Sequence, residues 1–218
     1  MWGAAQVGGR WIVAETELTL YGTVLSGHVH RVVLLLRMLK LPYRFVDAPR
    51  SARQTPEFGA LNPLRQVPVL QDGNLVLADS GAILVYLARH YDTAGIWLPR
   101  DPVGEARVQR FLSLAAGELA FGPAAARAVT LWGLPGDADA ARGVAARLLT
   151  FLEQHLAERP FLAAATPTIA DLACYAYVAR APEGRISLAP YPAVGAWLAR
   201  VEALEGFVPM PLSDVPAA

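Results

Sequence analysis

A hairpin signal in the first half of the chain constrains the fold more than any other feature. The apolar runs Val67–Leu70 and Leu75–Ala78 flank Asp72–Gly73, a dipeptide that favours a tight turn between antiparallel strands. Upstream, Leu18–Gly22 and Tyr43–Val46 have the pattern of short strands, and a helical pattern separates them. A helix between two strands indicates a parallel crossover, so the sequence predicts a small mixed sheet.

Helix start and stop signals complete this first unit. Apolar residues recur at helical spacing over Val29–Leu39, and Leu41–Pro42 ends that helix. Thr55–Pro56 predicts the start of a second helix, and Asp79–Ser80 predicts the N-cap of a third. The predicted order is β-α-β-α-β-β-α, a thioredoxin-like α/β layout that we assign to residues 17–92.

The rest of the chain has helical patterns and no convincing strand. Residues 93–102 are rich in turn formers and predict a linker. Residues 103–218 are expected to form an all-helical domain, because apolar residues recur at helical spacing over 144–155 and 194–204. Residues 1–16 are expected to form a loose N-terminal extension.

Composition excludes several classes of function. The chain has 218 residues, 54% of them hydrophobic and 17% charged, which suits a buried core. Its 19 basic residues balance 19 acidic ones without a basic stripe, which argues against nucleic acid or an anionic membrane as the main partner. Cys174 is the only cysteine, so an internal disulfide and a Cys-x-x-Cys pair are excluded. Without a signal-peptide pattern or a membrane-spanning run, we expect a cytoplasmic protein.

Ser26 is the first candidate for chemistry. It lies between the first strand and the first helix, where its hydroxyl and nearby backbone N–H groups would stabilise an anion. A serine at such a position is more often a plain N-cap, so both interpretations stay open.

Two dipeptides are further candidates. A cis Val67–Pro68 bond would turn the backbone groups of Val67 outward, where a bound peptide would pair with them; the alternative is an edge-strand proline without a ligand role. Asp79–Ser80 caps a helix, and it also suits the ammonium and carboxylate of an α-amino acid head.

The histidines and the cysteine receive structural interpretations. His28 and His30 lack a third ligand at metal spacing, so we expect solvated surface side chains and no metal. His90 and His155 are expected at helix surfaces or boundaries. Cys174 is expected to be a small core residue and not a nucleophile.

Three segments match one known family. They are LYGTVLSGHVHRV, TPEFGALNPLRQVPVLQDGNLVLADSGAILVYLARHY and PTIADLACYAYV. The first two resemble the glutathione-binding domain of cytosolic glutathione transferases of the serine-type bacterial, theta and zeta-like classes. The third, in which Thr168 and Asp171 form a capping-box pattern, resembles a segment of their helical domain. The resemblance covers about residues 18–205.

The resemblance implies a role for each candidate residue. Ser26 would hydrogen-bond the glutathione sulfur, and Val67, before a cis Pro68, would pair with the cysteinyl backbone. Asp79 and Ser80 would hold the γ-glutamyl head. The residues implied near the glycine end are either Arg53 and Gln54 or Arg65 and Gln66.

The sequence also departs from the family pattern. Asp79 stands where relatives usually have Glu or Gln and has a shorter reach. Gly27 and His28 replace the Ser–Cys pair of the zeta-like motif, which weakens an isomerase assignment. Tyr21 lies near the catalytic tyrosine of other classes but within a strand pattern, so we favour Ser26.

The implied activity is conjugation of the glutathione thiolate to small hydrophobic electrophiles, with glutathione as co-substrate and no metal. Alternatives are glutathione-dependent isomerisation or disulfide reduction, and a non-catalytic binding module. The joint presence of Ser26, Val67–Pro68 and Asp79–Ser80 argues against the last. Relatives pair as dimers, so we expect a homodimer. Candidate apolar walls for the electrophile, each also explicable as core, are Phe121, Trp132, Tyr175, Phe207 and Met210.

Overall fold

The computed structural model describes residues 6–7, 10–11 and 18–215. The expected extension over residues 1–16 lies outside the described residues except for two short strands, β1 (Gln6–Val7) and β2 (Arg10–Trp11), which pair antiparallel. The main sheet consists of β3 (Leu18–Gly22), β4 (Tyr43–Asp47), β5 (Val69–Asp72) and β6 (Leu75–Ala78).

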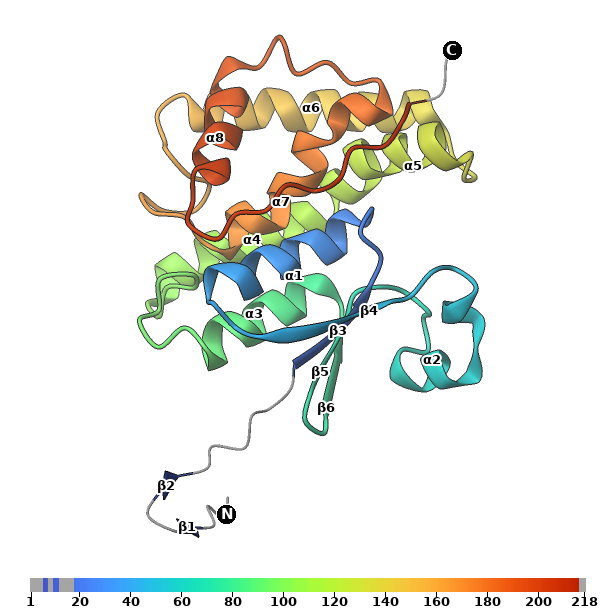
Figure 1. Ribbon diagram of the computed structural model, residues 1–218. Helices are drawn as coiled ribbons and strands as arrows, with labels where there is room; N and C mark the ends of the chain where they lie inside the picture. Colours follow the sequence, from blue (N-terminus) through green and yellow to red (C-terminus); the bar gives the residue numbers. More distant parts are fainter. Residues whose placement is uncertain (1–5, 8–9, 12–17, 216–218) are drawn as a thin grey trace.

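The predicted mixed sheet is confirmed. Its strand order is β4-β3-β5-β6, with β3 and β4 parallel and the β5–β6 hairpin antiparallel. Helix α1 (Gly27–Met38) makes the crossover between the two parallel strands. Helices α1 and α3 (Ser80–His90) lie between the sheet and the helical half of the molecule, and α2 (Pro56–Leu61) extends to the side (Figure 1).

Successive residues of each strand point to opposite faces of the sheet, and both faces are covered. Leu20 and Leu70 are buried in the main core with α1 and α3. Val69, the residue before Leu70, points to the other face and packs with Phe58 of α2 and with Ala48 in a separate small core. The sheet is therefore covered on both sides, as the thioredoxin-like prediction requires.

The second half is helical, and beyond residue 92 the described residues form no strand. The predicted capping box is present: Asp171 accepts the N–H of Thr168 at 2.9 Å while the Thr168 hydroxyl caps the helix. The elements are α4 (Pro102–Ala116), the π-helical turn η2 (Ala120–Ala124), α5 (Ala125–Trp132), α6 (Ala138–Leu156), α7 (Ile169–Ala179), the 3-10 turn η3 (Ala181–Gly184) and α8 (Pro192–Glu202).

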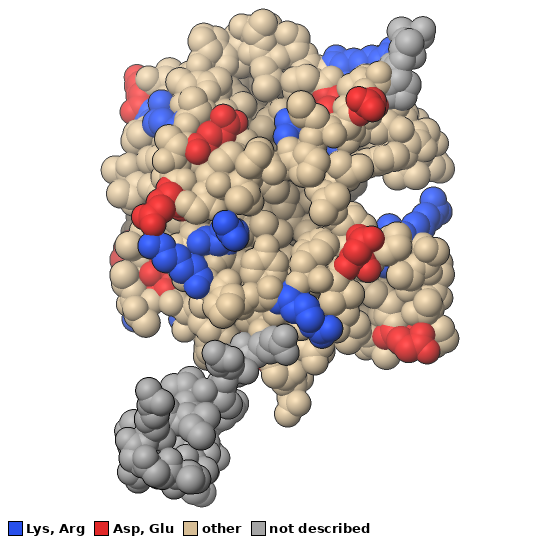
Figure 2. All heavy atoms as spheres, in the orientation of Figure 1, with Lys and Arg blue, Asp and Glu red and all other residues tan. Residues whose placement is uncertain are grey.

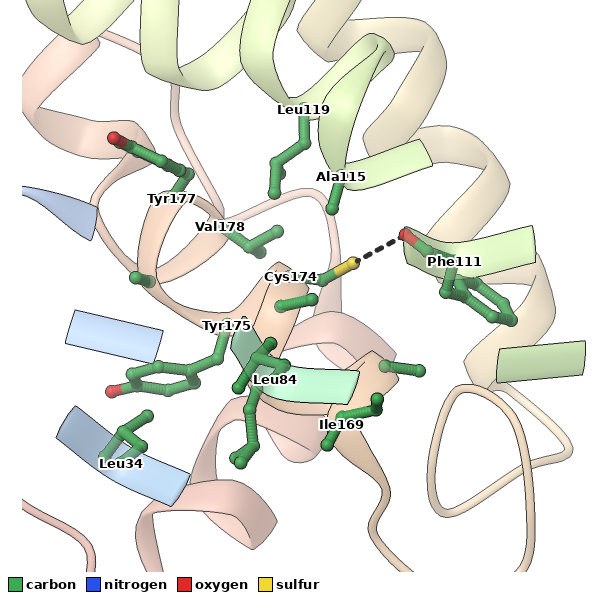
Figure 3. Packing of buried hydrophobic residues seen from close by; sticks show 14 of the residues in the cluster. Leu34, Leu84, Phe111, Ala115, Leu119, Ile169, Cys174, Tyr175, Tyr177 and Val178 are labelled. Carbon is green, nitrogen blue, oxygen red and sulfur yellow. Dashed lines mark hydrogen bonds between the residues drawn. The ribbon is translucent and has the colours of Figure 1, made fainter. Parts of the chain in front are cut away.

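Helix α7 joins the two halves into one core. Figure 3 shows Cys174 of α7 among apolar side chains that include Leu34 of α1 and Leu84 of α3. Its thiol contacts the carbonyl of Phe111 in α4 at 3.8 Å. Burial raises the pKa of the Cys174 thiol to about 12. The thiol is therefore neutral near pH 7 and serves packing, as predicted.

Candidate functional site

A cleft of about 970 Å³ lies between the α/β half and the helical half. Figure 2 shows the surface hollowed there, between the lobe around α5 and the lobe around α2. Four loops of the α/β half form one wall, and residues 124–134 together with Tyr177 of α7 form the other. The residues that line the cleft include Leu25, Ser26, His28, Asp47, Arg50, Arg53, Gln54, Gln66, Val67, Pro68, Asp79, Ser80, Ala124, Arg127, Ala128, Trp132, Leu134 and Tyr177.

Ser26 lines the cleft as the N-cap of α1. Its Oγ accepts the N–H of Val29 at 3.3 Å, and its hydroxyl also lies within hydrogen-bonding reach of the Tyr177 hydroxyl. The helix cap does not use the Ser26 proton, so that proton can be donated to Tyr177 or to a ligand. The N-terminus of this 12-residue helix carries a partial positive charge that favours an anion. Gly27 lets the Tyr177 ring pack against the first turn, because a Cβ there would lie 2.8 Å from its Cζ. Capping and anion binding are thus compatible at Ser26.

The Val67–Pro68 peptide bond is cis, as expected, and both residues line the cleft. The loop before it is held by Asn62, whose side-chain amide donates to the carbonyl of Gln66 at 2.9 Å. The segment that leads into β5 thus lines the same cleft as Ser26.

Asp79 and Ser80 line the cleft at the start of α3. Asp79 caps the helix by accepting the N–H of Ala82 at 2.9 Å, in a backbone conformation with φ of 72°. A positive φ in a residue other than glycine costs on the order of 1–3 kcal/mol and is found preferentially at functional sites. The Ser80 hydroxyl accepts a hydrogen bond from Nη1 of Arg31 at 3.2 Å.

The structure distinguishes between the residues proposed for the glycine end. Arg53, Gln54 and Gln66 line the cleft, together with Arg50. Arg65 does not line the cleft. Its guanidinium donates to the carbonyls of Arg53 and Thr55 at 2.9 and 3.0 Å and so stabilises the segment that carries Arg53.

The expectation of solvated histidines at the first helix is wrong. His28 lines the cleft, where burial, followed by the charge of Arg31, lowers its pKa to about 3. His30 is buried, and its Nε2–H donates to the carbonyl of Val208 at 2.9 Å. The chain after α8 covers this face of α1 (Figure 1), and a helical pattern does not reveal such a contact.

The apolar walls also differ from the predicted ones. Trp132 lines the cleft, but Phe121 is 69% exposed outside it. Tyr175 and Met210 are buried and Phe207 packs edge-on against Tyr175, so these three belong to the core. Their place at the cleft is taken by Tyr177, Leu134, Ala124 and Ala128. Tyr21 is absent from the lining, and its hydroxyl donates to Gln71 at 3.2 Å.

Arg127 is a site residue that the sequence did not indicate. Its Nη1 donates to the carbonyl of Leu25 at 2.9 Å, and its Nε pairs with Glu183 at 2.5 Å. The guanidinium also lies under the Trp132 ring, 4.9 Å from the centroid. No local signal predicts this contact, because Arg127 is 102 residues from Leu25 along the chain.

Two further observations concern ions and membranes. No His, Cys, Asp and Glu side chains of the described residues gather in a group of three or more that would hold a metal ion. Among the same residues, no helix combines the length and apolarity needed to span a bilayer.

Fold and cleft together define a thioredoxin-like domain fused to a helical domain, with a ligand cleft between them. The family models for the N-terminal and C-terminal domains of glutathione S-transferase match residues 16–89 and 103–200. Glutathione S-transferase 2 of Anopheles gambiae is 32% identical over 160 residues, covering 73% of this chain and 77% of that protein. The chain belongs to the glutathione S-transferase family of enzymes, whose substrate is glutathione.

Solved structures agree with this assignment. A glutathione S-transferase from Pseudomonas fluorescens superposes with a TM-score of 0.83 at 31% identity, covering 88% of this chain and 98% of that one. A glutathione transferase homologue from Drosophila mojavensis, solved with bound glutathione, superposes with a TM-score of 0.77 at 28% identity. It covers 86% of this chain and 88% of that one.

Proposed function

We propose that the protein conjugates the thiolate of glutathione to small hydrophobic electrophiles and that Ser26 stabilises the thiolate. The observation that carries the proposal is the position of the Ser26 hydroxyl. It lies at the N-terminus of α1, in the same cleft as the Val67 backbone and the Asp79–Ser80 pair. These are the three groups needed to hold the sulfur, the backbone and the amino-acid head of one tripeptide.

One hydroxyl and one helix N-terminus can supply the free energy needed to lower the pKa of the glutathione thiol. A thiol with a pKa near 8.5 is only a few per cent ionised at about pH 7, and lowering that pKa by about two units requires ~2.7 kcal/mol. A hydrogen bond to a charged group supplies ~1.5–3 kcal/mol, and a helix N-terminus adds ~0.3–1 kcal/mol. Neither a metal nor a general base is therefore needed.

The remaining groups orient the tripeptide. Val67 would pair with the cysteinyl backbone in the manner of an added strand. Asp79 would take the ammonium of the γ-glutamyl head and Ser80 its carboxylate. The glycine carboxylate would meet basic and amide side chains, which are Arg50, Arg53, Gln54 and Gln66.

The electrophile would lie against the helical wall of the cleft. Trp132, Leu134 and Tyr177 make this wall largely apolar, which favours a hydrophobic co-substrate. The only cysteine is buried in the core, which argues against disulfide reduction through a mixed disulfide with the protein. On this basis we assign glutathione binding to residues 17–92, the linker to 93–102 and electrophile binding to 103–218.

We further propose a homodimer. Exposed apolar side chains occur on the hairpin, in the linker and at the start of α4: Leu75, Val76, Ile96 and Val103. The uncharged balance of the chain also favours self-association.

The experiment that tests the activity is a panel of chromogenic electrophiles assayed with and without glutathione, with retention on immobilised glutathione measured in parallel. Glutathione-dependent conjugation supports the proposal. Retention without conjugation of any panel member would favour a binding module, and absence of both would contradict the proposal.

A further inference from the structure

Arg31 is a buried cation directly behind the cleft. It lies in the second turn of α1, its side chain is 3% exposed, and it is not part of the cleft wall. Its Nη1 donates to the Ser80 hydroxyl, whereas Nε and Nη2 have no hydrogen-bond partner among the described residues. Buried polar groups are almost always hydrogen-bonded, so this guanidinium requires an explanation.

The surroundings of Arg31 do not neutralise it. No carboxylate of the described residues forms an ion pair with it. Its polar neighbours include Tyr177 and Cys174, and burial raises the pKa of both groups, so they are uncharged near pH 7. The charged neighbour, Asp79, is exposed and already accepts the N–H of Ala82. The Tyr177 ring lies 6.0 Å from the Arg31 Cζ, a cation–π contact at the outer limit of its range. A buried charge without a carboxylate partner destabilises a fold, so stability alone does not explain Arg31.

Ser80 connects Arg31 to the cleft. A hydroxyl has one proton and two lone pairs, and one lone pair of Ser80 is taken by Arg31. Its proton therefore points elsewhere, either to Nδ1 of His28 at 3.4 Å or to an acceptor in the cleft. His28 and Ser80 both line the cleft. The arrangement thus presents a hydroxyl donor, backed by a positive charge, at one position of the cleft wall.

We propose that Arg31 is a positioning residue that selects the α-carboxylate of the γ-glutamyl head through Ser80. The guanidinium orients the Ser80 proton toward the ligand and supplies the positive charge that the carboxylate meets. With the negative Asp79 beside it, the cleft then recognises the two opposite charges of an amino-acid head. The inference rests on the proposed binding of glutathione.

The test compares glutathione with its analogue in which the γ-glutamyl α-carboxylate is a carboxamide. Dissociation constants are measured by titration calorimetry for the wild type, for Arg31→Met and for the matched control Arg37→Met, an exposed arginine on the same helix. The wild type and the control are expected to prefer glutathione clearly. Arg31→Met is expected to weaken glutathione binding roughly ten- to a hundredfold and carboxamide binding by less than about threefold, because only the carboxylate meets the charge.

Two results would overturn the inference: an unchanged preference in Arg31→Met, or equal weakening of both ligands, which a structural role would give. If Arg31→Met does not fold, Arg31→Lys carries the test. Retained preference there supports the role of the charge, and a lost preference overturns it. A wild type that binds glutathione without discriminating the carboxamide refutes this inference alone. A wild type that binds neither ligand refutes the proposed function as well.

Discussion

Arg127 in the helical domain donates a hydrogen bond to the carbonyl of Leu25, the residue that precedes Ser26. The same guanidinium pairs with Glu183 and donates to the hydroxyl of Ser213 in the C-terminal segment. That segment runs across α1 toward α5 (Figure 1). The position of the Ser26 loop thus depends on an ion pair in the other half of the molecule.

Glu183→Gln should therefore destabilise the protein and also impair the site. The side chains of Arg127 and Glu183 are 1% and 5% exposed, and removing one partner of a buried pair costs about 3–5 kcal/mol. Urea denaturation measures the loss. We expect Arg142→Met, which breaks an exposed pair with Asp139, to change the free energy of unfolding by less than about 1 kcal/mol. Equal effects of the two variants would contradict the assigned importance of the buried pair.

Asp79→Ala should weaken glutathione binding more than it slows the bound substrate. Asp79 lies at the amino-acid end of the proposed ligand, so KM for glutathione should rise and kcat should change little. Asp79→Asn is the control: Asn keeps the N-cap and tolerates the positive φ, so a loss shared by both variants comes from the charge. Collapsed kcat at unaltered KM would refute this placement.

The protein should lose stability as the pH falls below about 6.5. Burial lowers the pKa of both His28 and His30 in the folded state, that of His28 to about 3. Below the unfolded pKa, the unfolded chain therefore binds protons that the folded chain does not, and the free energy of unfolding falls by up to ~1.4 kcal/mol per pH unit for His28.

Urea denaturation at several pH values between about 7.5 and 5 checks this dependence. We expect His28→Gln to flatten it, and we expect His90→Gln, a change at an exposed residue of α3, to leave it unaltered. A wild-type stability that is constant over this range would contradict the buried, neutral state of these histidines.

Sedimentation at micromolar concentration should give a species of twice the 23.4 kDa chain mass. Val103→Asp, which places a charge at a residue of α4 that is 60% exposed, should shift the equilibrium from dimer toward monomer. Val24→Asp, an equally exposed change at a different place in the chain, is the control. A wild-type species with the mass of one chain would contradict the dimer proposal.

Local signals in the sequence were enough to predict the fold. The Asp72–Gly73 turn, the Thr55 and Asp79 caps and the Thr168–Asp171 capping box each involve residues a few positions apart, and all four are present. Such patterns depend on backbone geometry that neighbouring residues determine.

Contacts across the molecule could not be predicted in the same way. The burial of His30 depends on Val208, and the contact of Arg127 with Leu25 depends on how the two halves pack. The same limit explains why Trp132 lines the cleft whereas Phe121, eleven positions earlier in the chain, does not. These pairs share no spacing that a helical or strand period would reveal.

The most direct test of the central claim is the pKa of the glutathione thiol when bound, followed by the ultraviolet absorbance of the thiolate as a function of pH. We expect the wild type to lower this pKa by about two units from ~8.5. Ser26→Ala should bring the pKa of the bound thiol most of the way back to ~8.5. The same variant should lower kcat roughly ten- to several-hundredfold, the effect of losing ~1.5–3 kcal/mol. Tyr21→Phe, which removes a hydroxyl bonded to Gln71 outside the cleft, should change neither quantity. A thiol pKa that stays low in Ser26→Ala would contradict the account.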